Sequence, residues 1–518
     1  SKSGNTIIVT QAVNSYLNIT VSNQVLFATA INEISAKGVS YGNSTAKKDE
    51  KIMVEFLSPN TNKPLHLGHI RNGALGMSIS KLLETTGARV IKANLINDRG
   101  IHIAKSMLAW KIWGNNNTPK STGAKGDHFV GDWYVKFSQE LDRNPELINQ
   151  AQEMLKQWED GNPDIIALWK KMNSWVYEGF NDTFKKLGLE FDQTYYESET
   201  YKLGKSVVAE GLKRNVFQKE KNNAITAILP ADQFGVEKDG VNKKVTLIRP
   251  DGTSVYITQD LGTTKMKFEE NNLTRAIFVV GSEQEYHFKV LFSLLSKLGF
   301  AWADKCYHLS YGMVYLPDGK MKSREGKTVD ADDLFDSMKN LAIEEIEKRH
   351  KDNELSQTET EQRASAVALG AINYYLLQAS SRQDIHFDPK TSISFDGNTG
   401  PYCQYTYARA YSILEKNKEM RETPDFSLLG NNEELLLIQK LINFPEQINI
   451  AANELNPVKL ASAIYETAKA FNQFYQKHSI LNEEVKPLAA ARLELVRCTS
   501  SVIKKGLSLL NIETLNRM

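Results

Sequence analysis

The sequence predicts an α/β protein that continues into an all-helical C-terminal third. Two β-prone runs, 51–57 and 88–96, flank an apolar-periodic stretch at 65–86, which is the order of a βαβ unit. Further strand and helix patterns follow at 245–249, 255–258, 276–280 and 286–298. From about residue 381 to Met518 the helical pattern runs with few interruptions, which predicts a helical bundle.

The chain of 518 residues is too long for a single hydrophobic core, so we expect several domains. Residues 1–48 predict a short α+β domain, trimmed or reduced, because a β-prone run leads into a Gly-, Ser-, Asn- and Lys-rich stretch. Residues 49–380 form the expected α/β domain. An insertion at about 111–245 combines Trp-rich helical patterns with strand-like alternation. Residues 381–518 form the expected helical domain.

The composition is that of an ordinary globular protein, with 41% hydrophobic and 24% charged residues. The net charge of +1 neither indicates nor excludes a nucleic-acid partner. Cys306, Cys403 and Cys498 are widely spaced and lack Cys-x-x-Cys spacing, which argues against a disulfide framework and a structural zinc site. No apolar run is long enough for a membrane span, and the first residues lack the pattern of a secretion signal. We therefore expect a cytoplasmic protein with no metal site and no membrane contact.

The first candidate site is a pair of histidines that follows a β-prone run and a proline. Three-residue spacing places His66 and His69 on one face of a helix's first turn, where backbone N–H groups favour phosphate. Their imidazole N–H groups can donate to phosphate oxygens, Gly68 allows a base or ribose to come close, and Lys63 adds positive charge. A surface or capping role is the ordinary alternative for an isolated pair, but the preceding β-prone run favours a nucleotide site.

A lysine-rich segment, 319–327, stands after the last expected strand of the α/β domain. Its ammonium groups, including Lys320 and Lys322, can spread the charge of departing pyrophosphate in a transition state. A solvated charged turn is the ordinary alternative for this segment alone. Its order and distance relative to the histidine pair favour a role in handling nucleotide.

Both motifs resemble the signatures of class I aminoacyl-tRNA synthetases, which activate an amino acid through attack on the α-phosphate of ATP. The segment 319–327 is most similar to the arginyl-tRNA synthetase form, although Lys322 and Glu325 replace the serine and lysine usual there. Four more stretches resemble this family in order: 54–60, 256–261, 280–288 and 395–405. The resemblance implies a Rossmann-type catalytic domain with an insertion. It also implies that Lys63 substitutes for the missing loop lysine and acts with Lys320, and then Lys322, on pyrophosphate.

The resemblance implies an arginine site as well as an ATP site. A guanidinium group needs planar acceptors, and Glu55, Tyr256 and Asp260 stand where the family binds it. Taken alone, these three are ordinarily a strand-edge charge, a core aromatic and a helix cap. The residues implied for the amino and carboxylate end of arginine are Ser58, Asn60 and Gln284. The residues implied for ATP are His66, His69, Gly68, Gly281, Glu283, His287, Met313, Val314 and Ser323.

The helical region resembles the anticodon-binding bundle of the arginyl and cysteinyl enzymes. Exposed aromatic rings can stack on unpaired bases and arginine can hold phosphates, whereas aromatics at helical spacing are ordinarily core. The residues expected to contact tRNA are Tyr402, Gln404, Tyr405, Arg409 and Met518. The family also has a longer N-terminal domain that contacts the outer corner of tRNA, and residues 1–48 retain part of it.

The activity implied is ATP-dependent ligation of L-arginine to tRNA(Arg) through arginyl-adenylate, with Mg2+ entering with ATP and with AMP and pyrophosphate released. We expect the chain to act as a monomer. Another class I synthetase stays an alternative, although the cysteinyl enzyme would need a zinc-binding Cys/His set. Two further alternatives are a small-molecule nucleotidyltransferase and a non-catalytic tRNA-binding paralogue. The first is usually shorter than this chain, and the second would lack the histidine pair.

Overall fold

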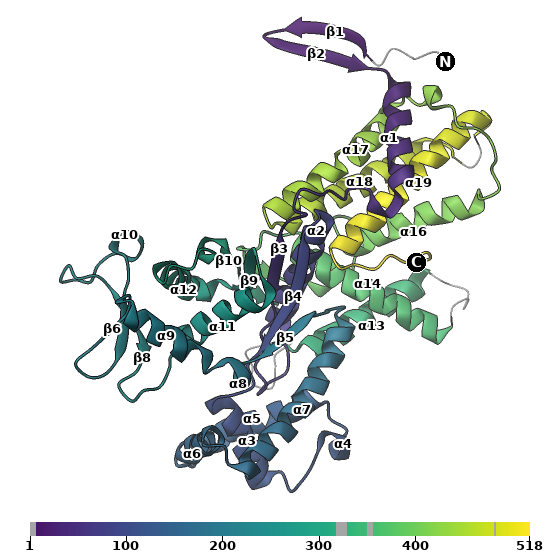
Figure 1. The fold of residues 1–518 in the computed structure, drawn as a ribbon. Coiled ribbons are helices and arrows are strands. Elements are labelled where there is room, and N and C mark those ends of the chain that lie inside the picture. Colours follow the sequence, from purple (N-terminus) through teal and green to yellow (C-terminus); the bar gives the residue numbers. More distant parts are fainter. Residues whose placement is uncertain (1–6, 317–328, 350–355, 481–482) are drawn as a thin grey trace.

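The computed structural model describes residues 7–316, 329–349, 356–480 and 483–518 (Figure 1). Lys320, Lys322 and Ser323, which the sequence assigns to pyrophosphate or ATP, lie outside these described residues. No helix in the described part of the chain is long and apolar enough to cross a membrane.

A five-stranded parallel sheet confirms the predicted α/β domain. Its strand order is β10-β9-β3-β4-β5. The strands are β3 (Lys51–Glu55), β4 (Arg89–Ile96), β5 (Gln193–Tyr196), β9 (Arg275–Gly281) and β10 (Cys306–Tyr311). The order reverses beside β3, because β4 lies on one side of it and β9 on the other. In open parallel sheets the crevice at the carboxyl ends of such strands is the usual ligand site.

Helices cover both faces of the sheet. Ile52 and Val54 of β3 join the core on the side of α2 (Leu67–Thr85), whereas Met53 joins the core on the opposite side. That opposite side is covered by α11 (Tyr256–Asn271) and α12 (Glu285–Lys297). Burial on both faces explains why the strand is a continuous apolar run.

Two predicted strands differ in the structure. Residues 255–258 begin helix α11, because Ile257, Leu261 and Phe268 repeat at helical spacing and are buried. The run at 245–249 is a strand, β8 (Lys244–Ile248), but it pairs outside the main sheet. It forms a small antiparallel sheet with β6 (Gln218–Lys219) and β7 (Ile225–Ile228).

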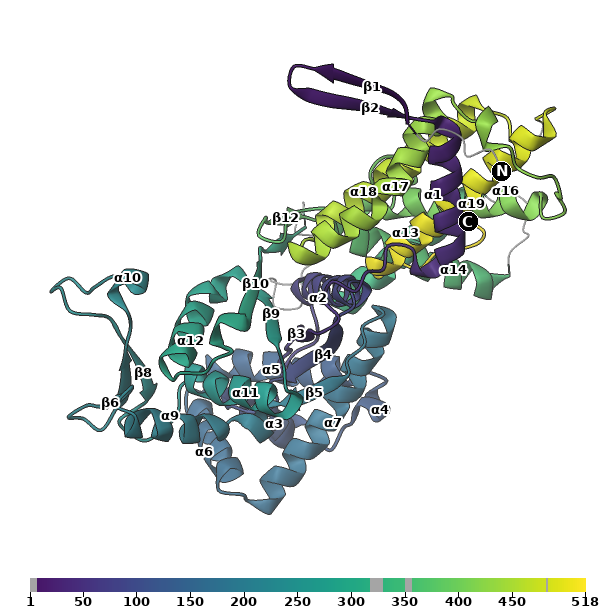
Figure 2. The same ribbon diagram turned by 45° about the horizontal axis from the view of Figure 1, so that its top comes forward.

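The predicted insertion, 111–245, is interrupted by a strand of the main sheet. Strand β5 pairs with β4, so the chain leaves the sheet twice. The first excursion is helical: α3 (Ile101–Trp113), α4 (Pro119–Thr122), α5 (Gly126–Leu141), α6 (Leu147–Glu159) and α7 (Pro163–Lys186). The second contains α8 (Glu197–Thr200), α9 (Leu203–Lys213), α10 (Ala231–Phe234) and the small sheet. Figures 1 and 2 show these two excursions on different sides of the main sheet.

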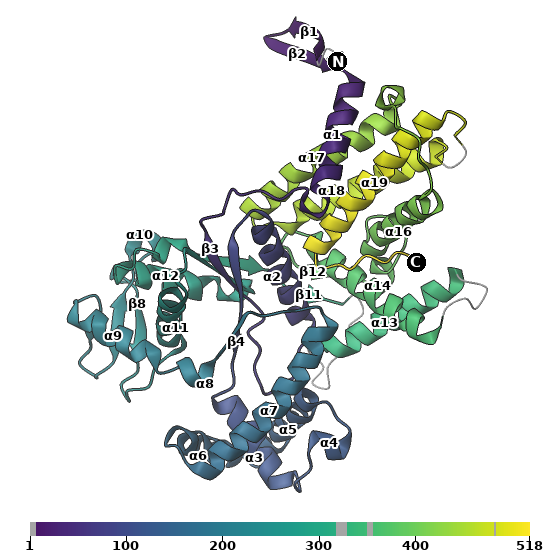
Figure 3. The same cartoon turned by 45° about the vertical axis from the view of Figure 1, so that its right-hand side comes forward.

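The C-terminal part is helical, as predicted. After α13 (Ala331–Arg349) and α14 (Gln357–Leu377), the bundle consists of α15 (Pro389–Ser392), α16 (Gly400–Lys416), α17 (Asn432–Asn453), α18 (Pro457–Lys477) and α19 (Lys486–Leu509). Helix α2 packs against α13, α14 and α17. The same helix therefore lies between the sheet and the bundle (Figure 3).

The N-terminal residues do not form a domain with a core of their own among the described residues. Helix α1 (Asn23–Lys37) packs along α17 and α19, with Phe27 and Ile31 in the bundle core (Figure 3). The hairpin of β1 (Ile7–Val13) and β2 (Tyr16–Val21) projects away from the bundle (Figure 1). The helical half of the predicted 1–48 domain thus belongs structurally to the bundle.

Arg71 of α2 joins three parts of the fold. Its fully buried guanidinium donates to the carbonyl oxygens of Gly312 (2.7 Å) and Met313 (3.3 Å). It also donates to those of Ser380 (3.1 Å) and Ser381 (2.9 Å). Burial lowers the pKa of Arg71 to about 10, so the group stays charged at neutral pH. One side chain therefore fixes α2 to the chain after β10 and to the start of the bundle.

Replacing Arg71 by methionine should lower the free energy of unfolding by at least about 3 kcal/mol, because buried carbonyls lose a charged donor. Urea denaturation followed by tryptophan fluorescence measures the change. Arg497→Met is the matched control, since Arg497 pairs with Glu494 at the surface, and a change below about 0.5 kcal/mol is expected. Equal effects of the two substitutions would contradict the role given to Arg71.

Candidate functional site

The histidine pair stands at the N-terminus of α2. His66 is the N-cap residue, and its Nδ1 accepts from the Gly68 N–H at 3.2 Å. The His66 backbone N–H donates in turn to Nδ1 of His69 at 3.1 Å, and the two ring centroids are 3.9 Å apart. Because each Nδ1 accepts a hydrogen bond, each neutral ring carries its proton on Nε2. Both Nε2–H groups therefore remain as donors for a ligand at the helix end.

Both histidines are held neutral. Burial, followed by the charge of Lys63, lowers the pKa of His66 to about 4. Burial, then His66 and Lys63, lowers the pKa of His69 well below its ordinary value. The rings can thus donate hydrogen bonds to phosphate without adding charge, and Lys63 supplies the positive charge beside them.

The turn between β3 and the histidines is strained and held in place. Leu57 and Ser58 have positive φ values of 79° and 27°, which non-glycine residues rarely adopt. The Leu57 N–H donates to Oδ1 of Asn72 at 2.7 Å, and Nδ2 of Asn97 donates to the Ser58 carbonyl at 3.2 Å. This turn delivers Asn60 to the carboxyl edge of the sheet, where it pairs with Asn97.

A cavity of about 710 Å³ opens at the same edge. Several predicted residues line it together: Asn60, Tyr256, Asp260, Gln284 and His287. Nε2 of His287 lies 2.6 Å from Oδ2 of Asp260, so the predicted ATP residue contacts the predicted guanidinium acceptor. The structure therefore joins residues that are far apart in sequence.

Glu55 is placed differently from the expectation. Its carboxylate forms a buried ion pair with Nζ of Lys267 from α11, and both side chains are almost fully buried. Among the described residues, Glu55 is not part of the cavity lining, and neither is Ser58. A guanidinium group would have to compete with Lys267 for Glu55, so its assignment to arginine stays a prediction.

Four charged residues of the cavity lining were not predicted from the sequence: Arg99, Glu159, Glu197 and Arg249. Glu197 follows β5, and burial raises the pKa of its carboxyl to about 7 even though Arg99 lowers it. The Arg99 guanidinium lies 3.9 Å from Glu197 and 2.5 Å from Glu159, and it stacks over Tyr201 at 4.0 Å. The position of Glu197 at the carboxyl end of a parallel strand is the signal that could have identified it.

The remaining predicted ATP residues lie after β9 and β10. Gly281 ends β9, and a Cβ there would lie 2.3 Å from a carboxylate oxygen of Glu283, so a larger residue would displace this exposed side chain. The Met313 N–H donates to Oδ1 of Asp384 at 2.7 Å. Val314 begins β11 (Val314–Tyr315), which pairs with β12 (Ile385–His386).

The residues predicted to contact tRNA separate into a surface and an interior set. The Arg409 guanidinium stacks over Tyr405 at 4.8 Å and over Tyr475 at 5.5 Å. Tyr402 and Met518 are half-buried. Gln404 is fully buried and donates to the carbonyl oxygens of Ala366 and Glu513, so RNA cannot reach it in this fold. The sequence spacing between Tyr402 and Gln404 did not show that Gln404 lies on the buried face of α16 and Tyr402 on a partly exposed one.

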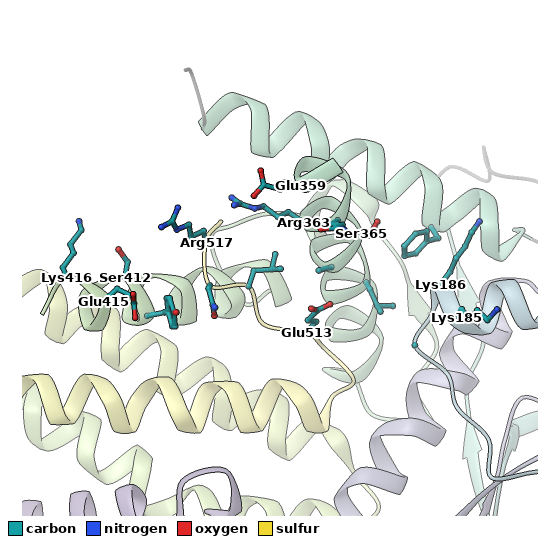
Figure 4. A pocket seen from close by; sticks show the side chains of 18 residues that line it. Lys185, Lys186, Glu359, Arg363, Ser365, Ser412, Glu415, Lys416, Glu513 and Arg517 are labelled. Carbon is teal, nitrogen blue, oxygen red and sulfur yellow. The ribbon is translucent and has the colours of Figure 1, made fainter. Parts of the chain in front are cut away.

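A wide groove of about 980 Å³ is lined on one side by Ser412, Glu415 and Lys416 of α16 (Figure 4). It is bordered by the end of α7, by α14 and by the C-terminal residues. Basic side chains outnumber acidic ones along it: Lys185, Lys186, Arg363, Lys416 and Arg517 against Glu359, Glu415 and Glu513. The groove joins the α/β domain to the bundle with a basic surface.

Comparisons with known proteins agree with this architecture. Residues 30–388 match the model of tRNA synthetases class I (R), catalytic domain, and residues 403–518 match the DALR anticodon binding domain. The chain is 44% identical to the arginine–tRNA ligase of Parabacteroides distasonis, covering 98% of this chain and 87% of that protein. It is 45% identical to that of Treponema denticola, covering 97% and 85%. The arginyl-tRNA synthetase structure from Thermus thermophilus superposes with a TM-score of 0.84 at 25% identity, covering 99% and 89%.

The protonation states of the histidines can be tested by ¹⁵N NMR of imidazole nitrogens. His66 and His69 should be neutral Nε2–H tautomers at pH 7, and His66 should titrate near pH 4. Because its folded pKa lies below the unfolded value of 6.5, stability is lost as pH falls from about 6.5 towards about 4. Titration of His66 near pH 6.5 would contradict this geometry.

Proposed function

The chain belongs to the class I arginyl-tRNA synthetases, and from that premise we propose that the cavity beside Asp260 binds L-arginine and the N-terminus of α2 binds ATP. The reaction of this family is the ATP-dependent ligation of L-arginine to tRNA(Arg). The observation that carries the assignment is a cavity in which Asp260 and Glu197 stand beside Asn60, which leads towards His66.

Acceptor groups in the cavity, which is also lined by Arg99 and Arg249, suit a guanidinium group. Asp260 and Glu197 offer carboxylate oxygens, and Tyr256 offers a hydroxyl at the same cavity. An arginine side chain beside Glu197 favours its ionised form, so binding at neutral pH should release protons from this carboxyl. Asn60 and Gln284 line the same cavity and would hold the amino and carboxylate end of the substrate, whereas Ser58 lies outside the lining and its role stays a prediction.

ATP activation takes place at the helix end. The arginine carboxylate attacks the α-phosphate, the bond to the β-phosphate breaks, and arginyl-adenylate and pyrophosphate form. The tRNA's terminal 2′-hydroxyl then attacks the carbonyl carbon of the adenylate, the anhydride bond breaks, and AMP leaves. The neutral Nε2–H groups of His66 and His69 donate to phosphate oxygens, and Lys63 balances charge. Mg2+ enters as the complex with ATP, since this ion prefers phosphate and water oxygens. Lys320, Lys322 and Ser323 stay predictions, as do the monomeric state and the cytoplasmic location.

Asp260→Asn should raise the KM for arginine by about 10- to 100-fold, because the guanidinium group no longer meets a charged hydrogen-bond partner. The KM for ATP should change by less than the KM for arginine, since Asp260 reaches ATP only through its contact with His287. Arginine-dependent exchange of pyrophosphate into ATP, measured with tRNA(Arg) present, reports both constants.

Asp304→Asn is the matched control, because Asp304 is an exposed carboxylate that pairs with Lys305. Its kinetic constants should equal those of the unmodified enzyme. An unchanged KM for arginine in the Asp260 variant would remove the proposed pocket.

We take the surface of Tyr405 and Arg409, the basic groove and the C-terminal Met518 as the proposed contacts of tRNA on the bundle. A stacked guanidinium between two tyrosines offers flat surfaces for unpaired bases. In the groove, Arg363, Lys416 and Arg517 come from separate segments, and no ion pair of theirs is found within the described residues. Such side chains can contact consecutive phosphates.

Arg363→Glu combined with Lys416→Glu should weaken tRNA(Arg) binding. The slope of the logarithm of the tRNA binding constant against the logarithm of salt concentration should become shallower by about one unit for each phosphate group that the variant no longer binds. Filter binding at several salt concentrations measures both effects. Lys219→Glu, at an exposed position of β6, is the control and should change neither. An unaltered slope in the double variant would place the RNA elsewhere.

A further inference from the structure

Helix α5 meets the surroundings of the histidine pair at two points. A Cβ at Gly131 would lie 2.9 Å from Cδ of Pro64, so the helix packs closely against the segment before His66. One turn earlier, His128 stands between two carboxylates. Its Nε2 lies 3.0 Å from Oδ2 of Asp330, and its Nδ1 lies 3.4 Å from Oδ1 of Asp127.

Asp330 is directly joined to the backbone that holds His66. The two residues face each other in an antiparallel bridge. The hydrogen bonds on either side of the bridge run from the Leu67 N–H to the Val329 carbonyl (2.8 Å) and from the Ala331 N–H to the Leu65 carbonyl (3.0 Å). The position of Asp330 therefore fixes the backbone on both sides of His66.

The other carboxylate oxygen of Asp330 caps the N-terminus of the next helix, α13. Oδ1 accepts from the backbone N–H groups of Asp332 (2.9 Å) and Asp333 (3.1 Å), which is an N-cap of α13. Since Oδ1 is used in this way, Oδ2 is left for His128. The carboxylate thus has one orientation in which it satisfies the helix, the imidazole and the bridge together.

Resting on the function proposed above, we infer that His128 is a positioning residue for adenylate formation: it holds Asp330, and through Asp330 it sets the place of His66 at the phosphates of ATP. His128 does not line the arginine cavity described above. Its effect should consequently fall on the ATP side of the reaction.

Carboxylates outnumber cations around His128 and favour its protonated form. Burial alone lowers the pKa of His128, but the hydrogen bonds and charges of Asp127 and Asp330 outweigh it and raise the pKa to about 10. Asp333 and Asp332 also face this group, as does Lys125, whose Nζ lies 3.1 Å from Asp127 and 2.6 Å from Asp332. A second cation, Lys186, lies 3.0 Å from Asp332.

Asp127, His128 and Asp332 have the spacing of three ligands around one ion. The ammonium of Lys125 already stands between the two carboxylates, so the positive charge of that cluster is supplied by the chain itself. The cluster is better explained as an ion-pair network that joins α5 and α7 to the start of α13.

The test is kinetic. His128→Ala should lower kcat for arginine-dependent pyrophosphate exchange, with tRNA(Arg) present, by about 10- to 100-fold, because a displaced catalytic group loses its alignment. The KM for arginine should stay within twofold. His128→Arg keeps the charge and the N–H donors and should recover most of the rate. Should the alanine variant be unstable, His128→Gln replaces it, and the same split between kcat and the KM for arginine is expected.

Asp330→Asn combined with His128→Ala separates positioning from general weakening. If His128 acts through Asp330, the double variant should be no slower than the slower single variant, whereas independent effects would multiply. His478→Ala is the matched control, because His478 forms a similar pair with Glu433 (3.0 Å) in the bundle. It should leave kcat unchanged.

Three results would overturn the inference: an unchanged kcat in the His128 variants, multiplying effects with Asp330→Asn, or a rise in the KM for arginine instead of a fall in kcat. Failure of the proposed function would look different, because Asp260→Asn would then leave the KM for arginine unaltered. The two ideas can therefore fail separately.

Discussion

The structure depends most on the four hydrogen bonds that Arg71 donates to backbone carbonyls. They fix the histidine-bearing helix α2 to residues 312–313 after β10 and to residues 380–381 before the bundle. Carbonyl groups in loops are hard to satisfy in an interior, and a planar cation with several donors satisfies them at once. One buried side chain thus connects the α/β domain, the chain after β10 and the start of the bundle.

Around helix α2, the sequence predicted individual helices and strands better than it predicted which of them pack or pair together. The apolar periodicity of 65–86 and the run of 51–57 were sufficient for α2 and β3, because both are dictated by burial along one short stretch. The prediction of a strand at 255–258 was wrong. The β-branched and aromatic residues there begin helix α11, whose buried apolar face extends to Phe268. The prediction of strand β8 was confirmed, but its place in the main sheet was wrong. The partner of a strand depends on residues far away in the sequence, which a local pattern does not report.

The site shows the same division. The resemblance assigned Asn60, Tyr256, Asp260 and Gln284 to arginine and His287 to ATP, and all five line one cavity. It could not show that Lys267 neutralises Glu55, or that Gln404 faces inward, because each depends on which neighbour packs against the side chain. The protonation of the histidines was also out of reach, since burial and the nearby Lys63 decide it.

The distribution of charge gives the site a direction. Asp260 contributes a carboxylate to the proposed arginine cavity, whereas Lys63 places a positive charge beside the histidine pair. An arginine molecule carries a cation at one end and a carboxylate at the other, so it is favoured in the orientation that points its carboxylate towards ATP. Neutral histidines suit the proposed arrangement, because they would hold phosphate oxygens by hydrogen bonds and would leave Lys63 as the charge that departing pyrophosphate meets. The low pKa of His66 is therefore part of how the site distinguishes its two ends.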